Sequence, residues 1–395
     1  MPRHSRAAAF VAAATLALGA LSGCGASDGS DADSPSTSGS TAAADSTQDV
    51  GAEAVGIDAA YAGILGTPPT EPAKAPAGAK VWVVSCGEAV PTCATPTAGA
   101  VAAAEAAGME ATSCDGKLNP QGWSECIRQG ISAKVDGIIV IGQDCSSFQS
   151  ALQEAKNAGI ATIGAGGNDC DISGGDTLYS ATTQMLPDMT AQQWWEKMGA
   201  LQAAWIIVKT DGKASVLSLK FTDAIWGGWI QDGFEAELAT CDGCKVEDTL
   251  ELGNQDVASG QLPQKVSTAL LKTPTANAVN VPLDGWFFAG LAQAIQSSGR
   301  SNDLNVIGNF GEVGNLGFIR SSGGEDATVG FSADWSGWAG VDALIRVLNG
   351  DKVVPAGIGL QVIDADNNMP AEGKPFAYNP VVDYASAYQK LWNAS

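Results

Sequence analysis

Short apolar runs rich in β-branched residues alternate along residues 80–169 with segments whose apolar residues recur at helical spacing. The runs, which predict strands, are 80–85, 109–113, 135–141 and 159–164. The segments between them, which predict helices, are 95–107, 120–134 and 146–158. Continuous apolar strands that alternate with helices indicate a parallel sheet covered by helices on both faces. Ligands of such sheets bind beyond the carboxyl ends of the strands, which here are 85–88, 143–145 and 166–169.

The alternation resumes in the second half of the chain. A fifth short strand is predicted at 176–180, and a long amphipathic helix at 190–209. We interpret the stripe on one face of that helix as core; it comprises Trp194, Met198, Leu201 and Trp205. Further strands are predicted at 214–219, 245–250, 276–281, 305–308 and 327–331, with 351–363 extended. Further helices are predicted at 228–239, 256–271, 285–298, 338–349 and 383–392. Two doubly wound α/β lobes joined by extended crossings would enclose a cleft that closes around a ligand.

The N-terminal 24 residues have the features of a secretory signal, with basic Arg3 and Arg6 before an apolar stretch. The final Leu-Ser-Gly-Cys is similar to the lipobox of bacterial lipoproteins, which predicts lipidation of Cys24. An ordinary cleaved signal with a chance cysteine is the alternative. Residues 25–78 are predicted to be a flexible low-complexity tether that contains a short helix at 53–65 and ends in a proline-rich linker. The folded body is therefore expected to begin near Ala79.

The formal net charge of −22 argues against binding to nucleic acid through a basic patch. The only histidine is His4, in the segment expected to be removed, which excludes histidine-dependent catalysis and zinc sites with histidine ligands. No phosphate-binding loop or dinucleotide fingerprint is present. Asp364, Asp366 and Asn368 are similar to the start of a calcium loop, but the turn glycine and the final glutamate are missing. We therefore predict no cofactor and no metal.

Nine cysteines less the lipidated Cys24 leave an even number in an exported protein, which predicts disulfides. The loops that follow the predicted strands suggest the pairs Cys86–Cys93, Cys114–Cys126, Cys145–Cys170 and Cys241–Cys244. The last pair could instead be a redox motif or half of a zinc site. Redox pairs gain reactivity at a helix N-terminus, whereas this pair follows a predicted helix, so a structural disulfide is favoured.

Several segments give the chain a family resemblance. They are VDGIIVIGQD (135–144), GIATIGAGG (159–167), VPLDGWFFAGLAQAI (281–295), NVIGNFG (305–311) and ATVGFSADWSGWAGVDALIRVLNG (327–350). In these the chain resembles the type I periplasmic substrate-binding proteins, the ribose- and galactose-binding family whose lipoprotein members serve bacterial ABC importers. The resemblance covers about 80–393.

The resemblance implies two lobes joined by a three-crossing hinge. One would comprise 79–180 with 327–350, the other 181–326 with 351–365, and 366–395 would form a C-terminal tail and helix. It also implies a monomeric, non-enzymatic protein, anchored through Cys24 to the outer face of the cytoplasmic membrane and docking on ABC permease subunits. A sensory receptor would have the same sequence features. An exported hydrolase that uses paired carboxylates is less favoured than either.

Ser85, Asp144 and Asp284 match polar positions common in the sites of this family. Sugar-binding members carry polar residues at other positions that are small or apolar here: Ile141, Gly166, Gly167, Leu283, Phe310 and Phe331. Our hypothesis is therefore an aromatic or amphiphilic small molecule, and a sugar is the alternative. The ligand is expected to stack among Trp226, Trp286, Phe310 and Trp335. The full candidate set is Ser85, Cys86, Glu88, Gln143, Asp144, Asn168, Phe221, Trp226, Asp284, Trp286, Asn309, Phe310, Phe331 and Trp335.

Overall fold

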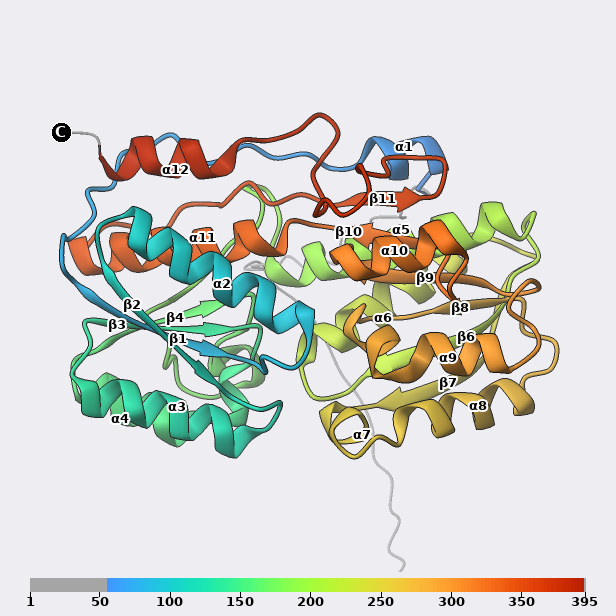
Figure 1. The fold of residues 1–395 in the computed structure, drawn as a ribbon, viewed down its shortest axis with the longest axis horizontal. Helices are drawn as coiled ribbons and strands as arrows, with labels where there is room; N and C mark the ends of the chain where they lie inside the picture. Colours follow the sequence, from blue (N-terminus) through green and yellow to red (C-terminus); the bar gives the residue numbers. More distant parts are fainter. Residues whose placement is uncertain (1–54, 394–395) are drawn as a thin grey trace, which may run out of the picture. The chain divides into compact units, whose positions relative to one another are not determined.

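The computed structural model describes residues 55–393, which contain two sheets (Figure 1). The first sheet is entirely parallel, in the order β2-β1-β3-β4-β5. Its strands are β1 (Lys80–Ser85), β2 (Glu110–Asp115), β3 (Gly137–Ile141), β4 (Ala161–Ala165) and β5 (Ala181–Thr182). The fifth strand thus follows the predicted 176–180, because the amides of Leu178 and Tyr179 donate to the Asp169 carboxylate instead of to a strand.

Helices cover both faces of this first sheet, and together they form the first lobe. They are α2 (Pro91–Ala106), α3 (Pro120–Ala133), α4 (Gln149–Asn157) and, from late in the chain, α11 (Ala333–Asn349), with short 3-10 turns η1 (Cys145–Ser147) and η2 (Cys170–Ser173). Successive residues of β3 enter different cores: Ile139 packs with α2 and α11, and Ile138 packs with α3 and α4. A strand buried on both faces explains the unbroken apolar run in the sequence.

The second sheet has the order β11-β10-β9-β8-β6-β7 and belongs to the second lobe. Its strands are β6 (Ser215–Phe221), β7 (Lys245–Leu252), β8 (Ala278–Asn280), β9 (Asn305–Phe310), β10 (Ala327–Gly330) and the antiparallel β11 (Gln361–Asp364). Its helices are α5 (Ala191–Lys209), α6 (Ile225–Leu238), α7 (Asn254–Ala258), α8 (Leu262–Lys272), the π-turn η3 (Phe287–Leu291), α9 (Ala292–Ser297) and α10 (Val313–Ser321). The predicted α/β class with two doubly wound lobes is confirmed.

Three details of the second lobe differ from the sequence prediction. The strand predicted at 327–331 was assigned with its helix to the first lobe, but β10 pairs with β9 in the second sheet, and only α11 packs on the first. The apolar pattern of a strand does not reveal its partner. The helix predicted at 285–298 is interrupted at Gly290, whose φ of 102° is accessible to glycine. Helix α10 was not predicted, since its glycines weaken the helical pattern.

The segment that precedes β1 is packed rather than a flexible linker. Helix α1 (Ile57–Ala62) lies against β11 and α5, and Ile64 forms a β-bridge with Leu360. Further along, the Arg346 guanidinium donates to the carbonyl of Glu71. The folded body therefore begins before Ala79. The predicted signal segment, the lipidation of Cys24 and most of the tether lie outside the described residues.

The C-terminal segment runs beside this N-terminal one. Helix α12 (Tyr384–Trp392) packs on α11, and the amide of Ala73 donates to the carbonyl of Leu391. In Figure 1, the blue segment after α1 and the red segment before α12 both pass from the second lobe to the first. The two lobes are thus connected by these segments as well as by the three predicted crossings.

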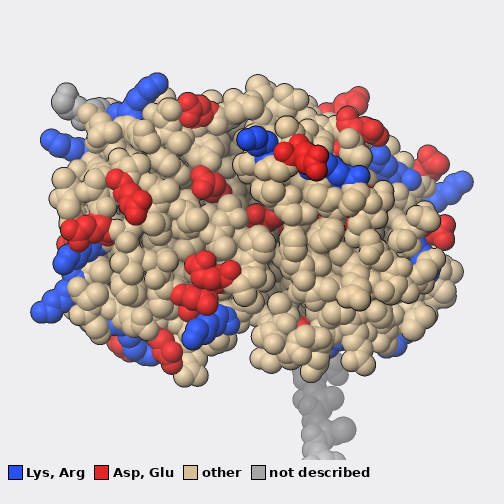
Figure 2. Space-filling model, viewed as in Figure 1, with Lys and Arg blue, Asp and Glu red and all other residues tan. Residues whose placement is uncertain are grey.

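All four predicted disulfides are confirmed, including the structural pairing of Cys241 with Cys244. Three of them close loops of the first lobe next to its strand ends. Acidic and basic side chains are interspersed on the face of the molecule drawn in Figure 2. Among the described residues, no helix has the length and apolar character needed to cross a membrane.

Candidate ligand-binding cleft

A pocket lies between the lobes, where the carboxyl ends of strands from both sheets face each other. It holds about 820 Å³ of space, including the part open to solvent. Cys86, Gln143 and Gly166 line it from loops that follow β1, β3 and β4. Residues at or after the ends of β6, β7 and β9 line it from the second lobe. The pocket is therefore at the position where doubly wound sheets bind ligands.

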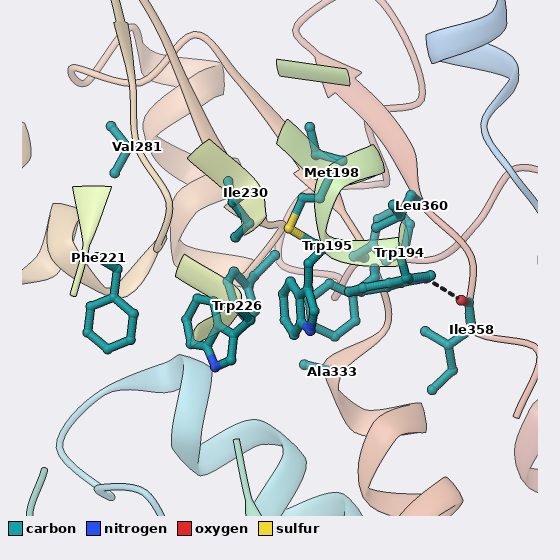
Figure 3. Packing of buried hydrophobic residues seen from close by; sticks show 14 of the residues in the cluster. Trp194, Trp195, Met198, Phe221, Trp226, Ile230, Val281, Ala333, Ile358 and Leu360 are labelled. Atoms are coloured by element: carbon teal, nitrogen blue, oxygen red, sulfur yellow. Dashed lines mark hydrogen bonds between the residues drawn. The ribbon is translucent and has the colours of Figure 1, made fainter. Parts of the chain in front are cut away.

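Aromatic rings form one wall of this pocket. The indole of Trp195 stacks on that of Trp226 with 4.9 Å between centroids, and Phe221 lies 4.9 Å from Trp226 on its other side (Figure 3). Phe310 and Phe331 form a second pair, also 4.9 Å apart. With Trp286, these rings make up the aromatic wall: Trp195, Phe221, Trp226, Trp286, Phe310 and Phe331. Five of them belong to secondary-structure elements of the second lobe or their flanks, and Phe331 immediately follows β10 of the same lobe, so the fold of that lobe positions the rings.

Few polar side chains line the pocket. Among the described residues they are Thr92, Gln143, Asn254 and Ser336, and no lining residue is ionisable. Gln143 is 5% exposed and Asn254 is 9% exposed. No group within residues 55–393 forms a hydrogen bond with Oε1 of Gln143 or with Nδ2 of Asn254. Two buried polar atoms of the lining residues therefore have no hydrogen-bond partner among the described residues.

Hydrogen bonds join the two lobes beside the pocket. Oδ2 of Asp144 accepts from the amide of Ile225 at 2.7 Å, in the first turn of α6. The first amides of a helix have no partner within the helix, and the N-cap Ala224 forms no side-chain hydrogen bond, so a carboxylate of the opposite lobe accepts from this helix end. On the other side, the Thr95 hydroxyl donates to the carboxylate of Glu312 at 2.9 Å. These contacts require the lobes to be close together, which identifies a closed arrangement.

A buried carboxyl shapes the turn that carries Phe310 into the pocket. Oδ2 of Asp284 accepts from the amides of Gly311 at 2.8 Å and Glu312 at 3.1 Å. Phe310 itself has φ of 89°, a strained conformation for a residue with a bulky side chain. Burial raises the pKa of Asp284 to about 8, despite these amide bonds. The neighbouring Glu325 is also buried, and its pKa is raised well above the ordinary value. Asp284 thus acts on the pocket through Phe310.

The family follows from comparison with known proteins. The profile of the periplasmic binding protein domain matches residues 90–352. The chain belongs to this family. Among curated protein sequences, none matches the chain. The resemblance inferred from the sequence is confirmed.

Solved structures of periplasmic binding proteins share the fold. One is an ABC transporter solute-binding protein from Burkholderia graminis in complex with D-arabinose, 22% identical, with a TM-score of 0.60, covering 75% of this chain and 99% of that one. Another is a 5-methylthioribose transporter solute-binding protein from Thermotoga lettingae, 16% identical, with a TM-score of 0.60 and coverage of 79% and 98%. A galactofuranose-binding protein is 17% identical, with a TM-score of 0.60 and coverage of 75% and 100%.

Half of the site residues predicted from the sequence line the pocket of this periplasmic binding protein: Cys86, Gln143, Phe221, Trp226, Trp286, Phe310 and Phe331. Several others support it from behind. Asp144 accepts from the side chain of Asn168, and Asp284 holds the Phe310 turn. Ser85 and Asn309 are fully buried, and Glu88 is exposed. These six residues and Trp335 do not line the pocket.

Trp335 lies in a different aromatic cluster. Its indole stacks on Tyr384 at 5.0 Å, and its Nε1 donates to the hydroxyl of Tyr388 at 3.3 Å. It is completely buried beneath the C-terminal helix. Of the four aromatic residues predicted to stack on the ligand, three therefore line the pocket: Trp226, Trp286 and Phe310.

Sequence reasoning missed Trp195 and Asn254. Trp194 points into the core, where its Nε1 donates to the carbonyl of Ile358, as Figure 3 shows. Trp195 is rotated by about 100° from it on the helix and reaches the pocket instead. The tryptophan pair at the start of a helix was the available signal. Asn254 lies two residues beyond the end of β7, so the strand-end rule used for the first lobe would have found it.

Proposed function

We propose that this protein is the extracytoplasmic solute-binding component of an ABC-type importer. It captures a small molecule between its lobes and delivers it to permease subunits in the membrane. The observation that carries the proposal is the pocket itself, which is lined from both lobes. A ligand that contacts both lobes favours the closed arrangement, and the closed form is what a permease would recognise.

The remaining parts of the proposal rest on the sequence. Lipidation of Cys24 would hold a monomer at the outer face of the cytoplasmic membrane, and the segment before α1 would serve as the tether. The protein would have no catalytic activity, so a bound ligand would be recovered unchanged. A receptor that passes the same ligand signal to a membrane sensor is distinguished by its partner, since only an importer stimulates transport by a permease.

We further propose that the ligand is an aromatic or amphiphilic small molecule. The six residues of the aromatic wall support this class, since apolar area removed from water contributes about 25 cal/mol per Å². A sugar is the second candidate. The related structures are named for D-arabinose, galactofuranose and 5-methylthioribose. The apolar faces of a sugar ring can also stack on an aromatic wall, so an amphiphilic sugar would satisfy both arguments.

The test is a thermal-shift and tryptophan-fluorescence screen of the exported protein with Cys24→Ala. Matched panels of sugars and of aromatic metabolites are added one compound at a time. A ligand that binds only the native state raises its apparent stability by about 2.7 kcal/mol at 100 times its Kd. We expect hits among aromatic or amphiphilic compounds. Binding of hydrophilic sugars only would overturn the ligand class, and no hit in either panel would contradict solute binding.

A further inference from the structure

We propose that the pocket selects an uncharged ligand whose flat apolar body carries a hydrogen-bond donor at one end, for Gln143, and an acceptor at the other, for Asn254. This inference rests on the proposed function and specifies the ligand of that same site. Gln143 follows β3 in the first lobe, and Asn254 begins α7 in the second. A ligand that meets both amides therefore bridges the lobes.

The absence of charge follows from the lining. Among residues 55–393, none of those that line the pocket has an ionisable side chain. The lining cysteines, Cys86 and Cys93, are joined in a disulfide and therefore do not ionise. An ion that enters an apolar site gives up its hydration, and without a partner of opposite charge this costs several kcal/mol. A charged solute is thus rejected relative to a neutral one of the same shape.

The carboxyl groups behind the wall do not supply that partner. Asp144 accepts hydrogen bonds from Asn168 and from the amide of Ile225. Asp284 accepts from the amides of Gly311 and Glu312. Both carboxyl groups accept from backbone amides, and neither Asp144 nor Asp284 is among the residues that line the pocket. A cation in the pocket would meet ring faces, whose attraction for it is weaker than the hydration that it gives up, and it would find no carboxylate among the lining residues.

The polar ends of the ligand follow from the two unpartnered atoms. Oε1 of Gln143 is an acceptor and Nδ2 of Asn254 is a donor, and both are buried without a partner among residues 55–393. A buried polar group that lacks its hydrogen bond has lost its contact with water and gained no partner, which is unfavourable. A ligand that satisfies both atoms recovers this energy on binding. These two bonds set the orientation of the ligand, while the aromatic wall contributes most of the buried area.

The test uses three ring-matched probes in titration calorimetry: neutral 4-hydroxybenzamide, anionic 4-hydroxybenzoate and cationic 4-hydroxybenzylammonium. We expect 4-hydroxybenzamide to bind at least tenfold more tightly than either ion. Gln143→Leu and Asn254→Leu should each weaken the neutral probe by about tenfold, which corresponds to about 1.4 kcal/mol. Gln143→Glu places a carboxylate in the pocket and should reverse the preference toward the cationic probe. Gln264→Leu, at an exposed position on α8, is the matched control and should leave all three affinities unchanged.

Equal binding of an ionic probe, or unchanged affinity for 4-hydroxybenzamide in both leucine variants, would overturn the inference. A melting curve of each variant shows that it is folded, and Asn254→Ser is the smaller substitution if Asn254→Leu is not. If 4-hydroxybenzamide fails to bind while a compound from the screening panels does, the inference fails and the proposed function stands. If neither the probes nor the panels bind, both fail.

Discussion

The two lobes stabilise the loops around the pocket by different means. In the first lobe, disulfides close the loops after the strands, and Cys86–Cys93 itself lines the pocket. In the second lobe, buried side chains do this work: Asp284 holds the turn at Phe310 through backbone amides. A disulfide holds a loop in the same way at every pH near neutrality. The hydrogen bonds that a buried carboxyl group accepts depend on whether that group is protonated.

The lobes also contribute different chemistry to the ligand. Nearly all of the aromatic wall belongs to the second lobe, whereas the first lobe supplies the disulfide, Gln143 and small residues such as Gly142 and Gly166. The aromatic side chains of the site thus belong mainly to one lobe. The second lobe is suited to receive the ligand first, and the first lobe to complete the site by closing over it.

The largest expected effect comes from opening the aromatic wall. Trp226 contacts Trp195 and Phe221, and its Nε1 donates to the carbonyl of Gly142 across the cleft at 3.4 Å. Trp226→Ala should destabilise the protein by about 3 to 5 kcal/mol and reduce affinity for any panel ligand by at least 100-fold. Urea unfolding and titration calorimetry measure the two effects.

Trp205→Ala is the control for Trp226→Ala. Trp205 is 1% exposed, is not among the residues that line the pocket, and its Nε1 donates to the carboxylate of Asp364. We expect it to lose stability by a similar amount while keeping ligand affinity within about threefold, a difference of less than 1 kcal/mol. Equal losses of affinity in the two variants would show that the wall acts only by stabilising the fold.

Removing the pocket disulfide should have the next largest effect. The loop between Cys86 and Cys93 is short, so Cys86→Ser with Cys93→Ser should cost about 2 to 3 kcal/mol by the chain-entropy estimate. Affinity should also fall, because the loop lines the pocket. The pair Cys241 and Cys244 lies outside the pocket lining, and its double serine variant should lower the melting temperature without changing affinity. The contrast fails if both variants, or neither, change ligand affinity.

Breaking the bond between Asp144 and α6 should have a smaller effect, confined to closure. Asp144→Ala removes the cross-lobe acceptor for the amide of Ile225 and should raise Kd about tenfold, or about 1.4 kcal/mol, mainly through a faster off-rate. Stopped-flow tryptophan fluorescence measures that rate. Asp171→Ala, an exposed acidic position, is the control. An unchanged off-rate in Asp144→Ala would mean that this bond does not hold the cleft closed.

The sequence was sufficient for the alternating strands, the four disulfides and seven of the residues that line the pocket, because these depend on local patterns and strand ends. It was insufficient where partners come from distant segments. No pattern in 327–331 distinguishes a strand of one sheet from a strand of the other. The proline-rich segment before β1 has few apolar residues, yet Ala73 is 1% exposed because it lies against the C-terminal helix. Trp335 and Phe310 are both aromatic residues near strand ends, and only packing separates the core ring from the pocket ring.

The second lobe should also show a pH dependence of its stability through Asp284. Its folded-state pKa of about 8 lies above the usual 3.9, so the folded protein keeps a proton that the unfolded chain releases. This contribution to stability is fully present below about pH 4 and is lost as the pH rises to about 8. Asp284→Asn retains a carbonyl oxygen to accept from Gly311 and removes the titration. We expect the fall in Tm between pH 5 and pH 8 to be smaller in this variant than in the wild type, because the proton that folded Asp284 holds at pH 5 is released as the pH approaches 8. Asp248→Asn, at an exposed position on β7, is the control and should leave the fall in Tm unchanged. If the wild type and Asp284→Asn have identical Tm profiles against pH, the two lobes do not differ in their response to protonation.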